Sequence, residues 1–413
     1  MICNRRIAFY ALVLCLLTIL NVPLIFASAD LRFSTQTKLV ADSQTRVDTY
    51  GAAIDIDGNT AVVSGSGSRF RGYPDDVVFV YARQGANWTL QQTLTAHDEE
   101  YNADDSYGFS VAISGDTLVV GAIGDSTAGF VAGAAYVYVR NGATWSLQQK
   151  LTAGDPATFS SFGISVDVTG DTVVVGAHGD DDAGYGTGAA YVFHRNGGVW
   201  TEQQKLKASD AVADASFGLS VSISGQTIVV GAPSLSSPGA SFSGAVYTFV
   251  NNGSTWLEQQ KIETHDITES QQLGYCVAIS GETIVASAPG EIVGAHTYGA
   301  VYVFERNGTT WDQQRKFIDR QTAKTDGFGL RAAIDGDTIV VGNLKLDTVA
   351  PWGGGGNVYV RNGNAGWSLQ YTLTATDAAY PDFLGQSVAI SGNTIMLGAP
   401  QKNEQKGAVY IYQ

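Results

Sequence analysis

The chain has 413 residues, of which 49 are glycine, and its formal net charge is −15 with a pI of about 4.6. Charged residues make up 15% of the chain, against about 25% in an average globular protein. The acidic balance argues against nucleic-acid binding, which needs a basic face to displace counterions from phosphates. Hydrophobic residues at 44% are sufficient for a core, so the composition excludes global disorder.

Residues 1–29 have the pattern of a secretory signal peptide. A short basic start precedes the apolar run from Ile7 to Leu20, and Ala27-Ser28-Ala29 forms a small-residue cleavage pattern. We therefore expect cleavage before Asp30 and a secreted protein, extracellular or at the cell surface. The alternative is an uncleaved anchor, because the run through Phe26 approaches the length that spans a bilayer. After cleavage we expect no membrane span, since no second apolar run of that length follows.

A unit of 55 to 57 residues recurs seven times in the rest of the chain. Each unit carries a glycine that follows an aromatic residue or leucine, and a tryptophan recurs at the same period in six positions. The glycines are Gly51, Gly108, Gly163, Gly218, Gly274, Gly329 and Gly385, and the tryptophans are Trp88, Trp145, Trp200, Trp256, Trp311 and Trp367. A fixed period of this kind indicates a repeat architecture.

Each unit contains four predicted strands, here called A to D in chain order. In the second unit they cover residues 110–114, 117–122, 134–140 and 144–152, which are rich in β-branched and aromatic residues. Gly115-Asp116 and Asn141-Gly142 separate strands as two-residue turns, because these residues tolerate positive φ. Four short antiparallel strands per repeat are typical of a propeller blade.

The two ends of the chain predict a closed ring. The last residues, Gly407 to Tyr412, match a strand C with no strand D after it. Residues 33–39 match the strand D segment Trp145–Leu151, with Phe33 in the tryptophan position. We therefore predict an all-β protein, a single seven-bladed β-propeller over residues 30–413, in which an N-terminal strand completes the last blade and protects its edge.

The repeated motifs resemble those of the FG-GAP repeat family. Phe162-Gly163 followed by Gly176-Ala177 is similar to the family pattern, and Gly231-Ala232-Pro233 and Gly398-Ala399-Pro400 match its second half. The resemblance extends over all seven units. It implies the seven-bladed propeller found at the N-terminus of integrin α subunits, where loops of one propeller face serve cell adhesion.

The sequence departs from the integrin-like pattern between strands A and B. Integrin-like repeats carry a calcium loop there, whereas this chain has tight turns such as Gly115-Asp116. The richest acidic remnants, Asp55 to Gly58 and Asp335 to Asp337, are too short to supply the six to eight oxygen ligands that calcium takes. The A–B turns therefore do not support calcium, and we expect no cofactor, with calcium held by the acidic loops as the alternative.

Catalytic motifs are not found in the sequence. The nucleophile elbow Gly-x-Ser-x-Gly, the phosphate-binding loop, His-Glu-x-x-His and Cys-x-x-Cys are all missing, and the five histidines have no metal-ligand spacing. We expect the protein not to be an enzyme. The repeated tryptophans invite a sugar-stacking interpretation, but a residue found at one strand position in nearly every blade is expected to pack between blades.

Candidate binding residues lie where the repeat varies. The A–B and C–D turns are short and share one face, called the turn face, while the variable B–C and D–A loops share the other, called the loop face. Loops on a rigid scaffold are the usual place for binding residues. Trp352 is the only tryptophan outside the repeat register, and exposed aromatics suit a sugar or a protein partner. The candidates are Phe70, Arg71, Tyr73, Tyr101, Asp104, Asp105, Asp180, Asp181, Asp182 and Trp352.

Three functions are compatible with the sequence. The leading hypothesis is an exported, non-enzymatic binding or adhesion protein whose partner is an extracellular protein or a glycan. The alternatives are a lectin-like propeller that binds carbohydrate and, less favoured, a propeller enzyme, since a fold does not define a function. Glycosylation sequons at Asn87, Asn252 and Asn307 lie in or beside C–D turns, and they serve either glycosylation or turn formation.

Overall fold

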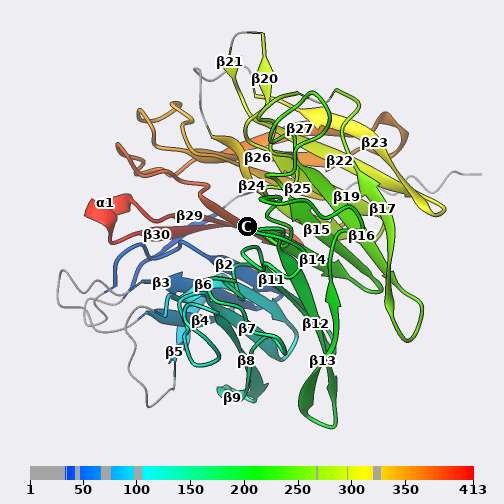
Figure 1. Cartoon of the computed structure of the whole chain (residues 1–413). Coiled ribbons are helices and arrows are strands. Elements are labelled where there is room, and N and C mark those ends of the chain that lie inside the picture. Colours follow the sequence, from blue (N-terminus) through cyan, green and yellow to red (C-terminus); the bar gives the residue numbers. More distant parts are fainter. Residues whose placement is uncertain are drawn as a thin grey trace, which may run out of the picture. The chain divides into compact units, whose positions relative to one another are not determined.

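Seven four-stranded antiparallel sheets form the blades of a ring in the described part of the chain (Figure 1). The structure is a computed structural model that describes residues 33, 35–41, 47–66, 76–96, 105–266, 268–294, 296–319 and 327–413. The predicted signal peptide therefore lies outside the described residues. Within them, no helix is both long and apolar enough to span a membrane.

The strands of each blade follow one another along the chain, except in the last blade. Blades 1 to 3 consist of β2 (Ile54–Asp57), β3 (Thr60–Gly65), β4 (Val77–Gln84), β5 (Asn87–Leu94); β6 (Tyr107–Ser114), β7 (Thr117–Ala122), β8 (Ala134–Asn141), β9 (Thr144–Leu151); and β10 (Val166–Thr169), β11 (Thr172–Ala177), β12 (Ala189–Asn196), β13 (Val199–Leu206). Blades 4 and 5 consist of β14 (Ser220–Ser224), β15 (Thr227–Ala232), β16 (Ala245–Asn251), β17 (Trp256–Ile262); and β18 (Val277–Ser280), β19 (Thr283–Ala288), β22 (Ala300–Asn307), β23 (Thr310–Phe317). Blades 6 and 7 consist of β24 (Phe328–Asp335), β25 (Thr338–Asn343), β26 (Gly355–Arg361), β27 (Trp367–Leu373); and β28 (Ser387–Ser391), β29 (Thr394–Ala399), β30 (Ala408–Tyr412), β1 (Gln36–Leu39). Loops carry the small hairpin β20 (Ile292–Val293) and β21 (His296–Thr297), the 3₁₀ turn η2 (Gly363–Ala365) and the one-turn helix α1 (Lys402–Gln405).

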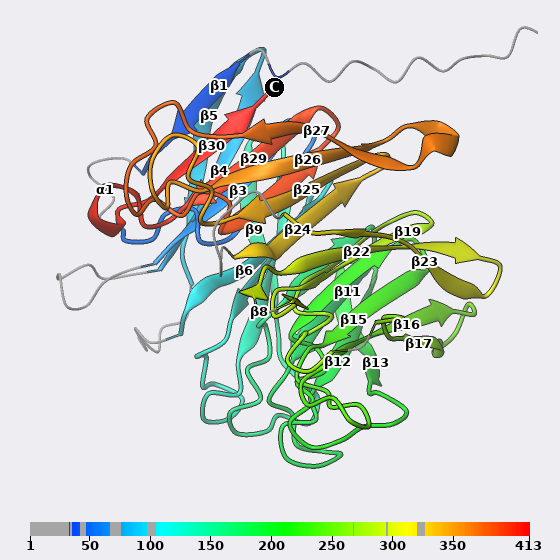
Figure 2. The same cartoon turned by 90° about the horizontal axis from the view of Figure 1, so that it is seen from above.

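The ring closes as the sequence predicts. Strand β1, from the N-terminal side, pairs antiparallel with β30 at the C-terminus, with Gln36 opposite Tyr412 and Leu39 opposite Val409. Figure 2 shows blue β1 lying beside red β30. The pairing gives the seventh blade its fourth strand and confirms the predicted closure.

The glycines of the repeat allow neighbouring blades to approach closely. Gly163 of blade 3 has a φ of 94°, and a Cβ at Gly121 of blade 2 would lie 2.1 Å from its carbonyl oxygen. A Cβ on Gly163 itself would lie 2.4 Å from the carbonyl oxygen of Ala134. No side chain fits in either place, so the Phe-Gly and Gly-Ala motifs are contact points between consecutive blades.

The repeated tryptophans pack between blades, as predicted. All six are at most 8% exposed. In blade 3, the Trp200 backbone exchanges two hydrogen bonds of 2.8 Å with the side-chain amide of Gln149 in blade 2. The indole Nε1 donates to Gln148 Oε1 at 2.8 Å, and the Arg195 guanidinium lies 4.9 Å from the ring centroid. The Trp-x-x-Gln-Gln pattern therefore encodes a joint between a strand D and the next strand D round the ring.

Candidate functional site

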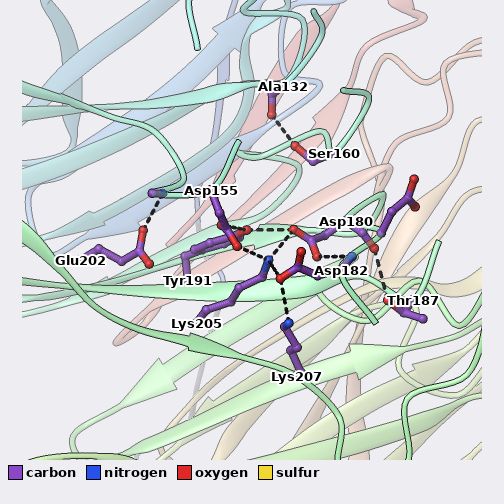
Figure 3. A network of polar contacts seen from close by, with 12 residues as sticks. Ala132, Asp155, Ser160, Asp180, Asp182, Thr187, Tyr191, Glu202, Lys205 and Lys207 are labelled. Carbon is purple, nitrogen blue, oxygen red and sulfur yellow. Dashed lines mark hydrogen bonds and ion pairs between the residues drawn. The ribbon is translucent and has the colours of Figure 1, made fainter. Parts of the chain in front are cut away.

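Asp180 and Asp182, predicted as binding residues, belong to a partly buried polar network in blade 3 (Figure 3). The Tyr191 hydroxyl lies 2.8 Å from a carboxylate oxygen of Asp180 and 2.8 Å from one of Asp155. The Lys205 Nζ lies 2.7 Å from Asp155 and 2.8 Å from both Asp180 and Asp182. Asp155 comes from the D–A loop before blade 3, so the network fastens that loop to the next blade.

The charged groups of this network are paired with one another, and this pairing shifts their pKa values. Burial raises the pKa of Tyr191 and the two carboxylates add to the rise, so the phenol stays protonated and can donate. Hydrogen bonds from Lys205 and Lys207 hold the pKa of Asp182 well below its usual range. Burial acts to lower the pKa of Lys205, but its three carboxylate partners outweigh that effect and raise it. Asp180 is 1% exposed.

Five blades contain this arrangement, which we call the tyrosine–lysine lock. A tyrosine on strand C, a lysine on strand D and at least one loop carboxylate meet within hydrogen-bond or ion-pair distance in each of them. The tyrosine, lysine and one acid are Tyr136, Lys150 and Asp125 in blade 2; Tyr191, Lys205 and Asp180 in blade 3; Tyr247, Lys261 and Asp210 in blade 4; Tyr302, Lys316 and Glu291 in blade 5; and Tyr410, Lys38 and Asp377 in blade 7. Acidic residues of the loops therefore pair with lysines on strand D in these blades.

Asp181 and Asp105, the other acidic candidates among the described residues, are not seen to contact Asp180 or Asp182 through their side chains. Asp181 is exposed, and its Oδ1 accepts the backbone N–H of Gly186 at 2.7 Å, within the same loop. Asp105 is half-buried before blade 2, and its backbone carbonyl accepts the N–H of Gly124. Five candidates lie outside the described residues: Phe70, Arg71, Tyr73, Tyr101 and Asp104.

Trp352 lies in an aromatic patch on the loop face. Its ring centroid is 5.5 Å from that of Tyr380 and 5.8 Å from that of Phe383, both from the D–A loop that follows blade 6. The Lys345 Nζ lies 4.9 Å from the indole. Trp352 is 39% exposed and Tyr380 is 64% exposed. The patch therefore presents two partly open rings beside a cation.

Two hydrogen bonds to its backbone fix the position of Trp352 in the B–C loop of blade 6. The Trp352 N–H donates to Asp347 Oδ1 at 2.7 Å, and its carbonyl accepts the N–H of Phe383 at 3.3 Å. Its φ is 54°, but Val131 and Phe242 have φ values of 52° and 53° at the same position of blades 2 and 4. The left-handed conformation therefore belongs to the loop of the repeat and is not particular to this site.

A second aromatic pair, which the sequence analysis did not single out, lies on the same face. Phe130 and Phe159 are 64% and 60% exposed, and their rings meet edge to face at 5.3 Å. Phe130 is in the B–C loop of blade 2, and Phe159 is in the following D–A loop. In the sequence, the two phenylalanines are single aromatic residues in two separate glycine- and serine-rich loops. They can be recognised as a pair only when the contact between the two loops is known.

The innermost strands enclose an axial cavity of about 320 Å³, with contributions from all seven blades. Arg331 lines it and lies 5.5 Å from the Tyr275 ring. Two carboxylates join adjacent innermost strands: Asp55 accepts the N–H of Ile113 at 2.7 Å, and Asp167 accepts that of Ile223 at 2.8 Å. Burial raises the pKa of Asp55 to about 7 and that of Asp167 to about 6.

No group of three or more histidine, cysteine, aspartate or glutamate side chains in the described residues is placed to hold a metal ion. This observation covers the A–B turns, where Asp57 and Asp335 instead accept the backbone N–H groups of Gly115 and Gly392, each at 2.6 Å. These two carboxylates thus connect the turns of neighbouring blades.

The fold and the motifs define a repeat propeller with a variable loop face. A family model for the FG-GAP repeat matches residues 88–138, 145–193, 200–249, 256–304, 311–361 and 367–412. These segments cover most of the chain, which therefore belongs to the FG-GAP repeat family. Each match begins at a repeat tryptophan on strand D of one blade and ends on strand C of the next, so the sequence unit bridges two blades. No curated protein matches the chain.

Proposed function

We propose that the protein is an exported, non-enzymatic binding protein that holds an extracellular protein partner on its loop face. The observation that carries the proposal is the patch of Trp352, Tyr380 and Phe383, because exposed aromatic residues on a rigid scaffold are the usual anchors of protein interfaces. Family membership supports a binding role. The hydrogen bond from the Phe383 N–H to the Trp352 carbonyl oxygen fixes the position of the patch.

The arrangement of two aromatic sites favours a macromolecular partner. Phe130 and Phe159 lie between blades 2 and 3, whereas Trp352 and Tyr380 lie between blades 6 and 7. Blades 3 to 6 separate the two sites on one side of the ring, and blades 7, 1 and 2 separate them on the other, so a small molecule does not reach both. The net charge of −15 favours a partner with a basic contact surface, since complementary charge steers association.

A glycan is the second candidate, and one observation favours it. Lys345 lies beside the partly open indole of Trp352, and Asp347 accepts the backbone N–H of the same residue, so polar groups flank an aromatic face that suits stacking on a sugar ring.

A pull-down with the purified mature chain, in the presence and absence of calcium, tests the proposal. Trp352→Ala should abolish retention of a protein partner, while Leu257→Ala should not. Leu257 is 54% exposed on β17, away from the loop face, so the control removes a similarly exposed apolar side chain. Retention that survives Trp352→Ala would refute the assignment to this patch. Trp352-dependent signals on a glycan array, without a retained protein, would favour the glycan instead.

A further inference from the structure

Blade 6 lacks the tyrosine–lysine lock that five other blades contain. In the strand registers, Asn357 takes the position of the tyrosine and Thr372 that of the lysine. Leu346 takes the position of the loop acid Asp125 of blade 2, since both donate a backbone N–H into the preceding strand end and accept one from the glycine before strand C. All three replacements remove the charged or phenolic group.

Blade 1 also lacks the lock, but a large aromatic ring still fills the position of the tyrosine. There Phe79 replaces the tyrosine, and it is fully buried. In blade 6 the smaller side chains of Asn357 and Thr372 stand in place of the tyrosine and the lysine. A cavity of about 860 Å³ lies at this place, between strand D of blade 5 and strands C and D of blade 6. That volume falls within the range of about 300–1,000 Å³ that is typical of ligand pockets.

The cavity has one aromatic wall and one polar wall. Phe317 and Tyr359 stack at 3.9 Å with their planes 12° apart, and both line the cavity. Burial raises the pKa of Tyr359 to about 12, so its phenol is a neutral hydroxyl at physiological pH. Asn357 Nδ2 donates to Asp319 Oδ2 at 3.3 Å, and Thr372 Oγ1 donates to Asn357 Oδ1 at 3.3 Å.

A further amide stands beside this polar wall. Asn343 occupies the position that is alanine in blades 2 to 5 and 7, and its Nδ2 donates to Asp319 Oδ2 at 2.9 Å. Asn343 is fully buried, and its Oδ1 has no hydrogen-bond partner. Burying a polar amide in place of a methyl group costs free energy unless it is satisfied, and Asp319 satisfies only the Nδ2 group here.

The groups on the walls restrict the chemistry of a ligand. Asp319 and Asp347 line the cavity and repel an anion, while Arg315 lines it as well and disfavours a cation. A purely apolar ligand would cover charged lining groups such as the exposed Arg315 without forming hydrogen bonds to them, which costs free energy. A neutral molecule with hydroxyl groups fits, because each hydroxyl both donates and accepts, and its carbon face can cover the aromatic wall.

We infer that the cleft between blades 5 and 6 is a binding site for a neutral saccharide, built by the loss of the tyrosine–lysine lock in blade 6. The site is distinct from the aromatic patch of Trp352, and its test does not depend on the protein-binding proposal. Asn357 and Thr372 supply the amide and hydroxyl contacts, and Phe317 and Tyr359 supply the apolar wall.

The decisive variant rebuilds the lock. Asn357→Tyr combined with Thr372→Lys places the tyrosine and lysine of the other blades into the cleft. Asp319, which accepts from Asn357 Nδ2 at 3.3 Å, supplies the carboxylate, so the double variant should fold with an undiminished melting temperature. Glucose, galactose, mannose and N-acetylglucosamine are titrated calorimetrically into the full mature chain and into this variant. We expect at least one of the sugars to bind the wild-type chain, and at least a tenfold weaker affinity in the double variant.

Two further variants separate the contributions. Asn357→Ala keeps the space and removes the amide, so it should also weaken sugar binding, while Leu257→Ala on β17 of blade 4 should leave the affinity unchanged. The inference is overturned if none of the four sugars binds the wild-type chain, or if the folded double variant binds a sugar as tightly as the wild type does. Tighter binding of cationic glucosamine than of glucose would contradict the assignment to a neutral ligand.

Discussion

Removing the charge of Lys205 tests the energetic role of the tyrosine–lysine lock. Lys205→Met preserves most of the side-chain volume but leaves the nearly fully buried Asp180 without a cation, whereas Tyr191 and the N–H of Asp182 still donate to it. Removing one partner of a buried ion pair costs about 3–5 kcal/mol. Asp155 and Asp182 are about half exposed and are solvated without the lysine, so we expect the lower end of this range.

This free energy corresponds to a measurable shift in melting temperature. The predicted cleavage before Asp30 would leave 413 − 29 = 384 residues. At about 2.1 cal/mol/K per residue the unfolding entropy is about 0.8 kcal/mol/K, so a loss of about 3 kcal/mol lowers the melting temperature by about 4 °C. Differential scanning calorimetry at pH 7 measures the shift.

Lys207→Met is the matched control. Lys207 makes one ion pair, with Asp182, and its side chain is 36% exposed, so its removal should cost less than about 1 kcal/mol. Adding Asp180→Asn to Lys205→Met should recover part of the loss, because no buried charge is then unpaired. Equal melting temperatures for Lys205→Met and Lys207→Met would show that the lock does not contribute as argued.

Three other predictions concern the joints of the ring. Trp200→Ala should cost about 3–5 kcal/mol in urea denaturation, because a 2%-exposed indole leaves a cavity between blades, and a loss below 1 kcal/mol would contradict this. Deleting residues 30–40 removes β1 and exposes the edge of β30, so the truncated mature chain should melt well below the complete one; an unchanged melting temperature would refute closure by β1. The folded pKa of Asp55, about 7, is above its unfolded value, so the stability it contributes is full below about pH 4 and is lost as pH rises through 7. Asp55→Asn should therefore gain stability relative to wild type between pH 4.5 and pH 8, and a pH-independent difference between Asp55→Asn and wild type would refute the assignment.

Local sequence patterns predicted the blades because the interactions involved are periodic. In blade 2 the expected strands over residues 117–122 and 134–140 correspond to β7 and β8, and strand A extends back to Tyr107, beyond the predicted start at Ser110. The extension crosses a register irregularity between Tyr107 and Ser110, which strand periodicity alone does not reveal. The terminal match of Phe33 likewise predicted which strand closes the ring.

The roles of the acidic residues could not be predicted in the same way. Asp180 and Asp182 form a run of charge in sequence and suggested an exposed binding loop, yet Lys205 on strand D and Tyr191 on strand C enclose Asp180. The lysine is more than 20 residues away along the chain, and the third carboxylate comes from the preceding D–A loop. Only the packing of one blade against the next brings these charges together.

The sequence by itself determined the repeat, the four strands of each blade and the closure of the ring, because glycine spacing, strand alternation and turn residues act over a few residues. The tertiary structure decided which loop residues are in contact with each other and which are open. It paired Trp352 with Tyr380, placed Phe130 against Phe159, and revealed the cleft that Asn357 leaves in blade 6. These features depend on contacts between separate loops and blades, and such contacts arise only when the ring is assembled.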